Sequence, residues 1–226
     1  MILDESQYGS RIGIQIIVYK IVVDTVQSFE PSVRLFILGR VDFVEEAEIH
    51  DTDRFLGEGE NLDMLKQAST LLLTTRRIPQ LYYGTEVMMN GVKSKSDGYV
   101  RKDFPGGWAD DKENALTPEG RTRLQNESYN FYRNLLNWRK GNDVIAKGSM
   151  KQFMVQHGVY AYARQYKGKT VFVLLNGTDK EVKLPLKYYA EVLKDKTQGK
   201  DVISGKVTAL NEELTMAPRQ SMVIEL

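Results

Sequence analysis

The sequence predicts an α/β fold followed by an all-β sandwich, and two observations carry this prediction. In residues 61–83 a helical hydrophobic pattern passes directly into a short apolar segment, the order of elements found in α/β folds. Beyond residue 145, short β-forming segments recur between turn sequences at the spacing of a β-sandwich. We therefore divide the chain into an unassigned N-terminal segment (residues 1–45), an α/β part (46–144) and a C-terminal β-sandwich (145–226).

The composition argues against several classes of partner and site. A formal net charge of +1 gives no field that would attract nucleic acid or an anionic membrane, so we expect neither as a partner. The apolar run at residues 12–23 is too short and too mixed to span a bilayer, and it favours a buried strand or strand pair. The chain has no cysteine, and its two histidines, His50 and His157, are far apart. We therefore expect no disulfide, no metal site and no cofactor.

The α/β part begins with a helix and a strand. The helix starts at Asn61 and is expected to close at Arg76 and Arg77, where positive charges suit the C-terminal dipole. Its buried face is predicted from the spacing of four residues: Leu62, Leu65, Ala68 and Leu72. Residues 78–83 read as a short buried strand that Gly84 ends, with Pro79 tolerated at the start.

A long loop and a second helix follow. Residues 87–117 contain several turn-forming pairs, and a loop of this length in a compact domain is usually functional or disordered. Thr117 and Pro118 have the residue types of an N-cap and a first helical position, so we expect the helix to begin there. Gly141 is placed to cap its C-terminus. The expected buried face consists of Leu124, Phe131, Leu135 and Trp138.

The remaining sequence has β patterning throughout. We place the boundary near residues 143–147 and expect the sandwich to pack on the helix that ends near Lys140. The only helical segment expected after Met150 is a short turn near residues 188–193. The predicted strands are residues 159–166, 170–175 and 181–184, with shorter ones at 202–203, 207–210, 214–216 and 221–226.

Three segments, in this order, resemble motifs of the α-amylase family of glycoside hydrolases. They are IHDTDRF (residues 49–55), similar to the motif that ends the seventh barrel strand; IPQLYYGTE (78–86), similar to the eighth-strand segment; and RKDFPGGW (101–108), similar to the following loop in the neopullulanase and cyclomaltodextrinase branch. The resemblance covers roughly residues 50–226. It implies that the α/β part is the C-terminal part of a (β/α)8 TIM barrel.

The resemblance also implies a chemistry. Members of this family cleave α-1,4-linked glucans or cyclodextrins with retention, using a nucleophile and an acid/base carboxyl about 5 Å apart. By its position in the motif, Asp51 would be the third carboxylate, which binds sugar hydroxyls. His50 would donate a hydrogen bond in the same subsite. Both would lie at the C-terminal end of a barrel strand, next to the strand holding residues 81–83.

Further substrate-binding candidates lie in and after these motifs, and each has a structural alternative. Arg54 is a substrate contact or a partner for Asp53 or Glu86. Glu86 lines the rim of the site or fastens its loop, and Trp108 stacks on a glucose ring or anchors the loop. Arg101 and Asp103 are candidates whose simpler interpretation is a solvated surface. For Tyr82 and Tyr83 the barrel core is expected rather than a platform that stacks on sugar rings, because consecutive strand residues face opposite sides.

The departures from the family pattern bear on activity. The family's nucleophile stands in an Arg-x-Asp motif on the fourth strand and its acid is a Glu on the fifth, whereas Arg40-Val41-Asp42 lies too close to Asp51 for that role. Ile49 and Arg77 stand where the family usually has Asn and Gly. We therefore expect a truncated portion that lacks nucleophile and general acid. The alternative is a non-catalytic carbohydrate-binding or assembly remnant.

The resemblance leaves assembly and location open. Unpaired strand edges of a partial barrel favour pairing with another chain, so a homo-oligomer is one expectation. Relatives occur in both the cytoplasm and the periplasm, and residues 1–10 do not have the pattern of a signal peptide.

Overall fold

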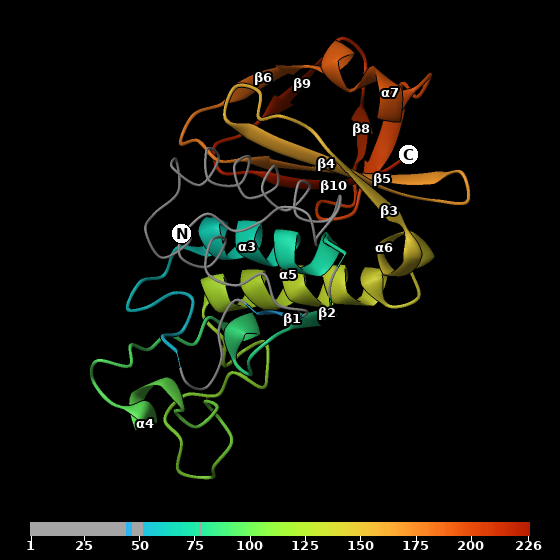
Figure 1. Cartoon of the computed structure of the whole chain (residues 1–226). Coiled ribbons are helices and arrows are strands. Elements are labelled where there is room, and N and C mark those ends of the chain that lie inside the picture. Colours follow the sequence, from blue (N-terminus) through green and yellow to red (C-terminus); the bar gives the residue numbers. More distant parts are fainter. Residues whose placement is uncertain (1–43, 47–51, 77) are drawn as a thin grey trace, which may run out of the picture.

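The computed structural model describes residues 44–46, 52–76 and 78–226, and its elements form a helical layer beneath a β-sandwich (Figure 1). His50, Asp51, Arg77 and the apolar run at residues 12–23 lie outside the described residues. The first half contains β1 (Val44–Glu46), α3 (Leu62–Thr74), β2 (Ile78–Gln80), η2 (Thr85–Val87), α4 (Asp97–Val100), α5 (Arg123–Arg139) and α6 (Asp143–Lys147).

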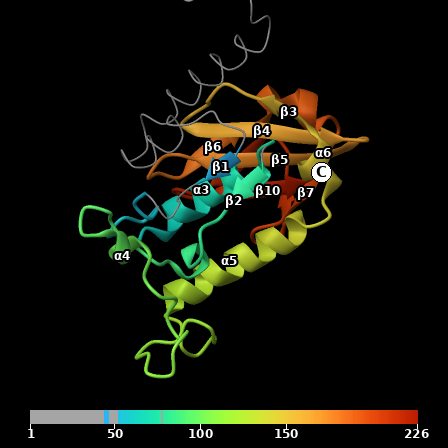
Figure 2. The same ribbon diagram turned by 60° about the horizontal axis from the view of Figure 1, so that its bottom comes forward.

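Helices α3 and α5 lie side by side and pack against the sheet of the sandwich (Figures 1 and 2). The predicted start of α3 is confirmed, since the Asn61 side chain caps it by accepting from the Met64 N–H at 3.0 Å. Leu65 and Leu72 are fully buried, and each such side chain contributes about 1.5–3 kcal/mol. The helix ends at Thr74, so Arg76 lies beyond its last turn.

The predicted start of α5 at Thr117 and Pro118 is wrong. The helix begins at Arg123, because Thr122 and Gln125 form a capping box in which each side chain bonds the other residue's backbone N–H. Thr117 instead accepts from the Gly120 N–H within a turn. Gly141 has a φ of 86°, in keeping with its predicted place after the helix.

Strands β1 and β2 form a parallel pair, with Val44 opposite Ile78. The pair and the intervening α3 make a β–α–β unit. The expectation of a buried strand over residues 78–83 is wrong in two respects: β2 ends at Gln80, and the Ile78 side chain is 73% exposed. Only two strands form this sheet among the described residues, so a side chain on β2 has little sheet surface to pack against.

The sandwich confirms the predicted β architecture. A six-stranded sheet, in the order β3-β4-β5-β10-β7-β8, faces the two-stranded sheet β6-β9, and the only helical segments after Met150 are η3 (Leu186–Tyr189) and α7 (Ala190–Leu193). The strands are β3 (Ser149–Gln152), β4 (Val159–Tyr166), β5 (Lys169–Asn176), β6 (Val182–Pro185), β7 (Gln198–Asp201), β8 (Val207–Ala209), β9 (Glu213–Met216) and β10 (Ser221–Glu225). The strand expected at residues 202–203 is a turn, because the Asp201 carboxylate accepts from the Ile203 and Ser204 N–H groups.

Both faces of the large sheet are buried, which explains its long apolar runs. On β5, Phe172 and Leu174 pack toward β6 and β9, whereas Val171, Val173 and Leu175 pack toward α3 and α5. Strand side chains alternate between faces, so β5 contributes side chains to the core between the two sheets and to the core between the large sheet and the helices. The sandwich therefore packs against the helix ending at Arg139, as the sequence predicts, and Trp138 Nε1 adds a bond to Glu225 at 2.8 Å.

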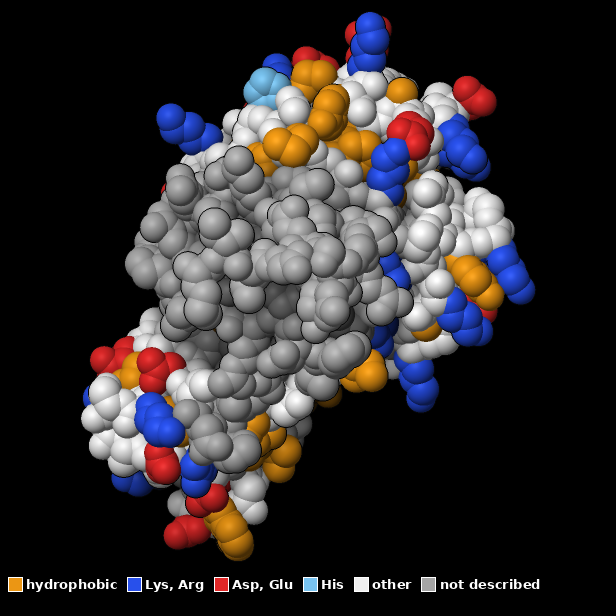
Figure 3. Space-filling model, in the orientation of Figure 1, with side chains coloured by type: hydrophobic (Ala, Val, Ile, Leu, Met, Phe, Trp, Pro, Cys, Tyr) orange, Lys and Arg blue, Asp and Glu red, His pale blue; other side chains and the backbone are white. Residues whose placement is uncertain are grey.

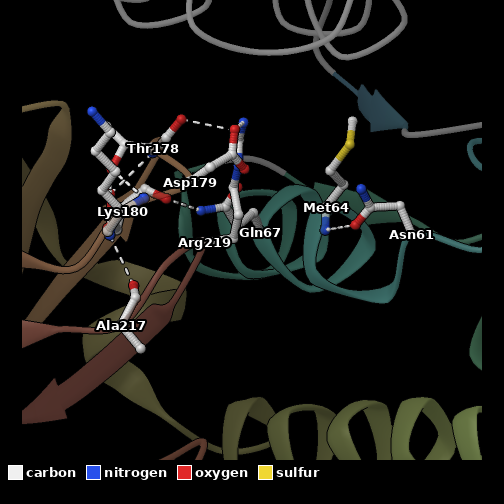
Figure 4. A network of polar contacts seen from close by, with 10 residues as sticks. Asn61, Met64, Gln67, Thr178, Asp179, Lys180, Ala217 and Arg219 are labelled. Carbon is white, nitrogen blue, oxygen red and sulfur yellow. Dashed lines mark hydrogen bonds and ion pairs between the residues drawn. The ribbon is translucent and has the colours of Figure 1, made fainter.

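Polar groups also join the helical layer to the sandwich, among them the buried side chains of Arg164 and Gln67. Arg164 on β4 donates to the carbonyls of Thr74 and Thr75 at the end of α3, and also to three carbonyls at the α6–β3 junction: Ile145, Gly148 and Ser149. Near the middle of α3, Gln67 Nε2 donates to the Asn176 carbonyl at 2.6 Å. The loop around Asn176 is itself closed by the bidentate pair between Arg219 and Asp179 (Figure 4).

Candidate functional site

Arg54 is the centre of the candidate site, because it connects the segment after β1 to the segments after β2. Its side chain is 1% exposed. Nε donates to the Val100 carbonyl at 2.9 Å, and one terminal amino group donates to the Tyr83 carbonyl at 2.6 Å. Burying a guanidinium is costly unless its donors are satisfied, so these contacts fix the relative position of three segments.

The Arg54 guanidinium also lies over the rings of Tyr82 and Tyr83, at 4.4 and 4.7 Å from their centroids. The two rings meet edge to face with centroids 4.6 Å apart. The expectation that these tyrosines face opposite sides is therefore wrong. They lie beyond the end of β2, where strand alternation no longer applies. The Arg54 guanidinium makes cation–π contacts with both rings.

Tyr83 is not a core residue, since it is 41% exposed. Its hydroxyl donates to the Lys102 carbonyl at 2.6 Å, which ties the ring to the loop after α4. Burial raises the pKa of Tyr82, a hydrogen bond with Tyr83 adds to that rise, and the charges of Arg54 and Arg101 oppose it. Arg101 is therefore close enough to Tyr82 to act on it electrostatically. It also forms an exposed ion pair with Asp97 at 3.3 Å.

Backbone contacts fasten the same loops. The Arg54 N–H donates to the Gly91 carbonyl at 2.9 Å, the Gly91 N–H donates to the Gly57 carbonyl at 2.7 Å, and the Lys93 N–H donates to Asp53 Oδ1 at 2.6 Å. A Cβ at Gly91 would lie 2.6 Å from the Tyr99 carbonyl oxygen, so only glycine fits there. Much of the long predicted loop is therefore held in place by specific bonds.

Trp108 is held by a separate set of contacts. The Asp111 carboxylate accepts from the N–H groups of Gly106 and Trp108 at 2.8 and 3.1 Å, which leaves the indole 64% exposed. Asp103 is exposed in the preceding loop, and Glu86 is partly exposed in η2. A hollow of about 150 Å³ lies nearby, lined by Pro105, Glu113, Ala115, Gly120, Thr122 and Gln125.

Two contributors to the candidate site, Tyr83 and Asp111, are not predicted by the sequence pattern. Tyr83 was expected in the core because the predicted strand runs to residue 83, whereas β2 ends at Gln80. Asp111 was not singled out, although an acidic side chain in a glycine-rich turn often accepts backbone N–H bonds. In the described ranges, no group of acidic or histidine side chains could hold a metal ion, and no helix is long and apolar enough to cross a membrane.

Comparisons with known proteins show which family the C-terminal domain belongs to. Residues 150–225 match the family model described as the cyclomaltodextrinase C-terminal domain. The chain carries an α-amylase-family C-terminal domain. An α-amylase of Niallia circulans is 28% identical over 178 residues, which cover 75% of this chain and 30% of the relative. A cyclomaltodextrinase of Thermoanaerobacter pseudethanolicus is 32% identical over 133 residues, covering 58% of this chain and 20% of that enzyme.

The fold comparison extends beyond the sandwich. The α-amylase of Geobacillus thermoleovorans has a TM-score of 0.62 at 19% identity, with 92% of this chain and 42% of that one covered. The chain spans less than a third of the length of these two curated relatives. The resemblance seen in the sequence is thus confirmed for the family and for the β domain.

Proposed function

We propose that this chain is the C-terminal portion of a retaining glycoside hydrolase that acts on α-1,4-glucans or cyclodextrins. In this proposal residues 46–144 are the end of a (β/α)8 barrel. The observation that carries it is the parallel β1–α3–β2 unit, whose following segments are joined by Arg54. Barrel enzymes build their active sites from the loops at the carboxyl ends of adjacent parallel strands.

The roles divide between carboxylate chemistry and sugar binding. Asp51 is the proposed third carboxylate, which stabilises the distorted sugar ring, and His50 hydrogen-bonds a sugar hydroxyl. Arg54 is too deeply buried for a large contact with substrate, so we assign it to positioning the loops. Glu86, Arg101, Asp103 and Trp108 are proposed to line the rim of the substrate site.

The chemistry of the substrate fits this surface. An α-glucan is neutral, with hydroxyl groups around its edge and C–H groups on its ring faces. The exposed aromatic rings of Tyr83 and Trp108 suit those faces, and the exposed charged side chains of Arg101 and Asp103 suit the hydroxyls.

The proposal is tested by titration calorimetry of the 226-residue chain with maltoheptaose and with cellohexaose, which differs in its β-1,4 linkage. We expect binding of maltoheptaose only, and about tenfold weaker binding by Asp51→Asn, because a charge-assisted hydrogen bond is lost. Asp63→Asn, which changes an exposed residue in the first turn of α3, should bind like the unchanged chain. Equal binding of the two sugars, or none, would contradict the proposal.

A further inference from the structure

We infer that Tyr83 is a carbohydrate-stacking platform, held by Arg54 so that one glucose unit of an α-1,4-glucan rests on its exposed ring. The inference deepens the proposed function and rests on it. The sequence favours the barrel core over a sugar platform for Tyr83, and the family resemblance gives it no role.

Three contacts fix the orientation of the Tyr83 ring. The Arg54 guanidinium lies 4.7 Å from its centroid, the Tyr82 ring meets it edge to face, and its hydroxyl bonds the Lys102 carbonyl at 2.6 Å. The arginine is itself fixed by bonds to the Tyr83 and Val100 carbonyls. The ring is thus constrained by parts of the chain that precede and follow it.

Although these contacts restrain the ring, 41% of Tyr83 remains exposed. Contacts that order an exposed apolar surface before any ligand arrives reduce the entropy lost on binding, so a ligand that stacks on this ring binds more tightly. Tyrosine has only two side-chain torsions to restrain, so little conformational entropy is lost in ordering such a surface.

The surroundings of the ring indicate a neutral, hydroxyl-rich ligand. The aromatic face accepts the C–H groups of a pyranose ring through its negative quadrupole. Arg101 lies close enough to the adjacent Tyr82 for its positive charge to act on the pKa of that hydroxyl. The guanidinium N–H groups of Arg101 are donors that suit sugar hydroxyls.

The test compares maltoheptaose binding by Tyr83→Ala, Tyr83→Phe and Tyr188→Ala. The last is the matched control, because Tyr188 is 46% exposed on the sandwich, in η3. Stacking predicts about five- to tenfold weaker binding by Tyr83→Ala. Tyr83→Phe keeps the ring and should retain most of the affinity, and Tyr188→Ala should bind like the unchanged chain.

A second measurement does not depend on Tyr83→Ala folding. In protein labelled at the tyrosine ring carbons, the signal missing from the Tyr83→Phe spectrum identifies Tyr83, and that signal should shift when maltoheptaose is added. Binding that leaves this signal unmoved, or that Tyr83→Ala leaves unchanged, overturns the platform alone. Absence of binding by the unchanged chain overturns the proposed function and this inference with it.

Discussion

Arg54 and Arg164 show what single buried side chains do in this molecule: each joins segments far apart in the sequence through backbone carbonyl groups. Arg164 reaches from β4 to the ends of α3 and α6, and five carbonyls accept from it. Helix C-termini carry partial negative charge, which compensates the buried cation. Desolvation nevertheless lowers the pKa of Arg164, and the nearby Arg76 and Arg139 charges act in the same direction.

Replacing Arg164 should strongly destabilise the chain. Arg164→Met removes the donors while the carbonyls stay buried, so we expect the free energy of unfolding to fall by about 3–5 kcal/mol. Arg133→Met, at an exposed position of α5, should cost about 0.5 kcal/mol or less. Urea unfolding of both variants measures the difference. A loss below about 1 kcal/mol for Arg164→Met would show that the carbonyls find other partners.

Gly91 provides a test of the packing around the candidate site. An added methyl group would lie 2.6 Å from the Tyr99 carbonyl oxygen, so Gly91→Ala should destabilise the chain by about 1–3 kcal/mol. Gly98→Ala in α4 has its nearest neighbour at 3.8 Å and should be neutral or slightly stabilising. Thermal unfolding of the two variants gives the comparison, and equal midpoints would contradict the described approach of these loops.

At the scale of elements, the start of α5 depends on the Thr122–Gln125 capping box. Thr122→Ala should lower the free energy of unfolding by about 1 kcal/mol. Thr117→Ala removes only an exposed turn hydrogen bond, and it should cost less than half as much. The same urea experiment decides between the two positions, since a larger loss at Thr117 would place the helix start where the sequence first suggested it.

These elements also show which features a sequence can predict. The N-cap at Asn61 and the β-forming runs of β4, β5 and β10 are local patterns, and the structure has them where expected. Thr117-Pro118 is an equally good local signal, but the reciprocal bonds of Thr122 and Gln125 prevail. The Arg54 cluster could not be predicted, because its partners stand 29 and 46 residues away and no spacing rule connects them.

At the scale of the whole molecule, the helical layer and the sandwich share a core, with Phe131 and Leu135 packed against Tyr162 and Val173. The family and the β domain were predictable because motif order and strand spacing agree over most of the chain. The boundary near residues 143–147 stays a prediction. His50 and Asp51 lie outside the described residues, so their roles also remain proposals.

The proposed division of roles predicts that the chain alone does not hydrolyse its ligand. A retaining glycosidase needs a positioned nucleophile and a proton donor, and neither motif has a fitting match in these 226 residues. Reducing-sugar release from maltoheptaose and β-cyclodextrin should stay at the background level. Turnover that disappears in Asp51→Asn would contradict this and would indicate that Asp42 or a nearby Glu performs the missing roles.

Hydrogen exchange with and without maltoheptaose locates the binding surface directly. Because a ligand slows exchange of the amides that it covers or orders, we predict added protection in the segments after β1 and β2, in peptides spanning residues 50–57 and 81–108. Amides of the sandwich beyond residue 149 should exchange at unchanged rates. Protection confined to the sandwich, or none at saturating sugar, would contradict the claim that these two loops form the carbohydrate site.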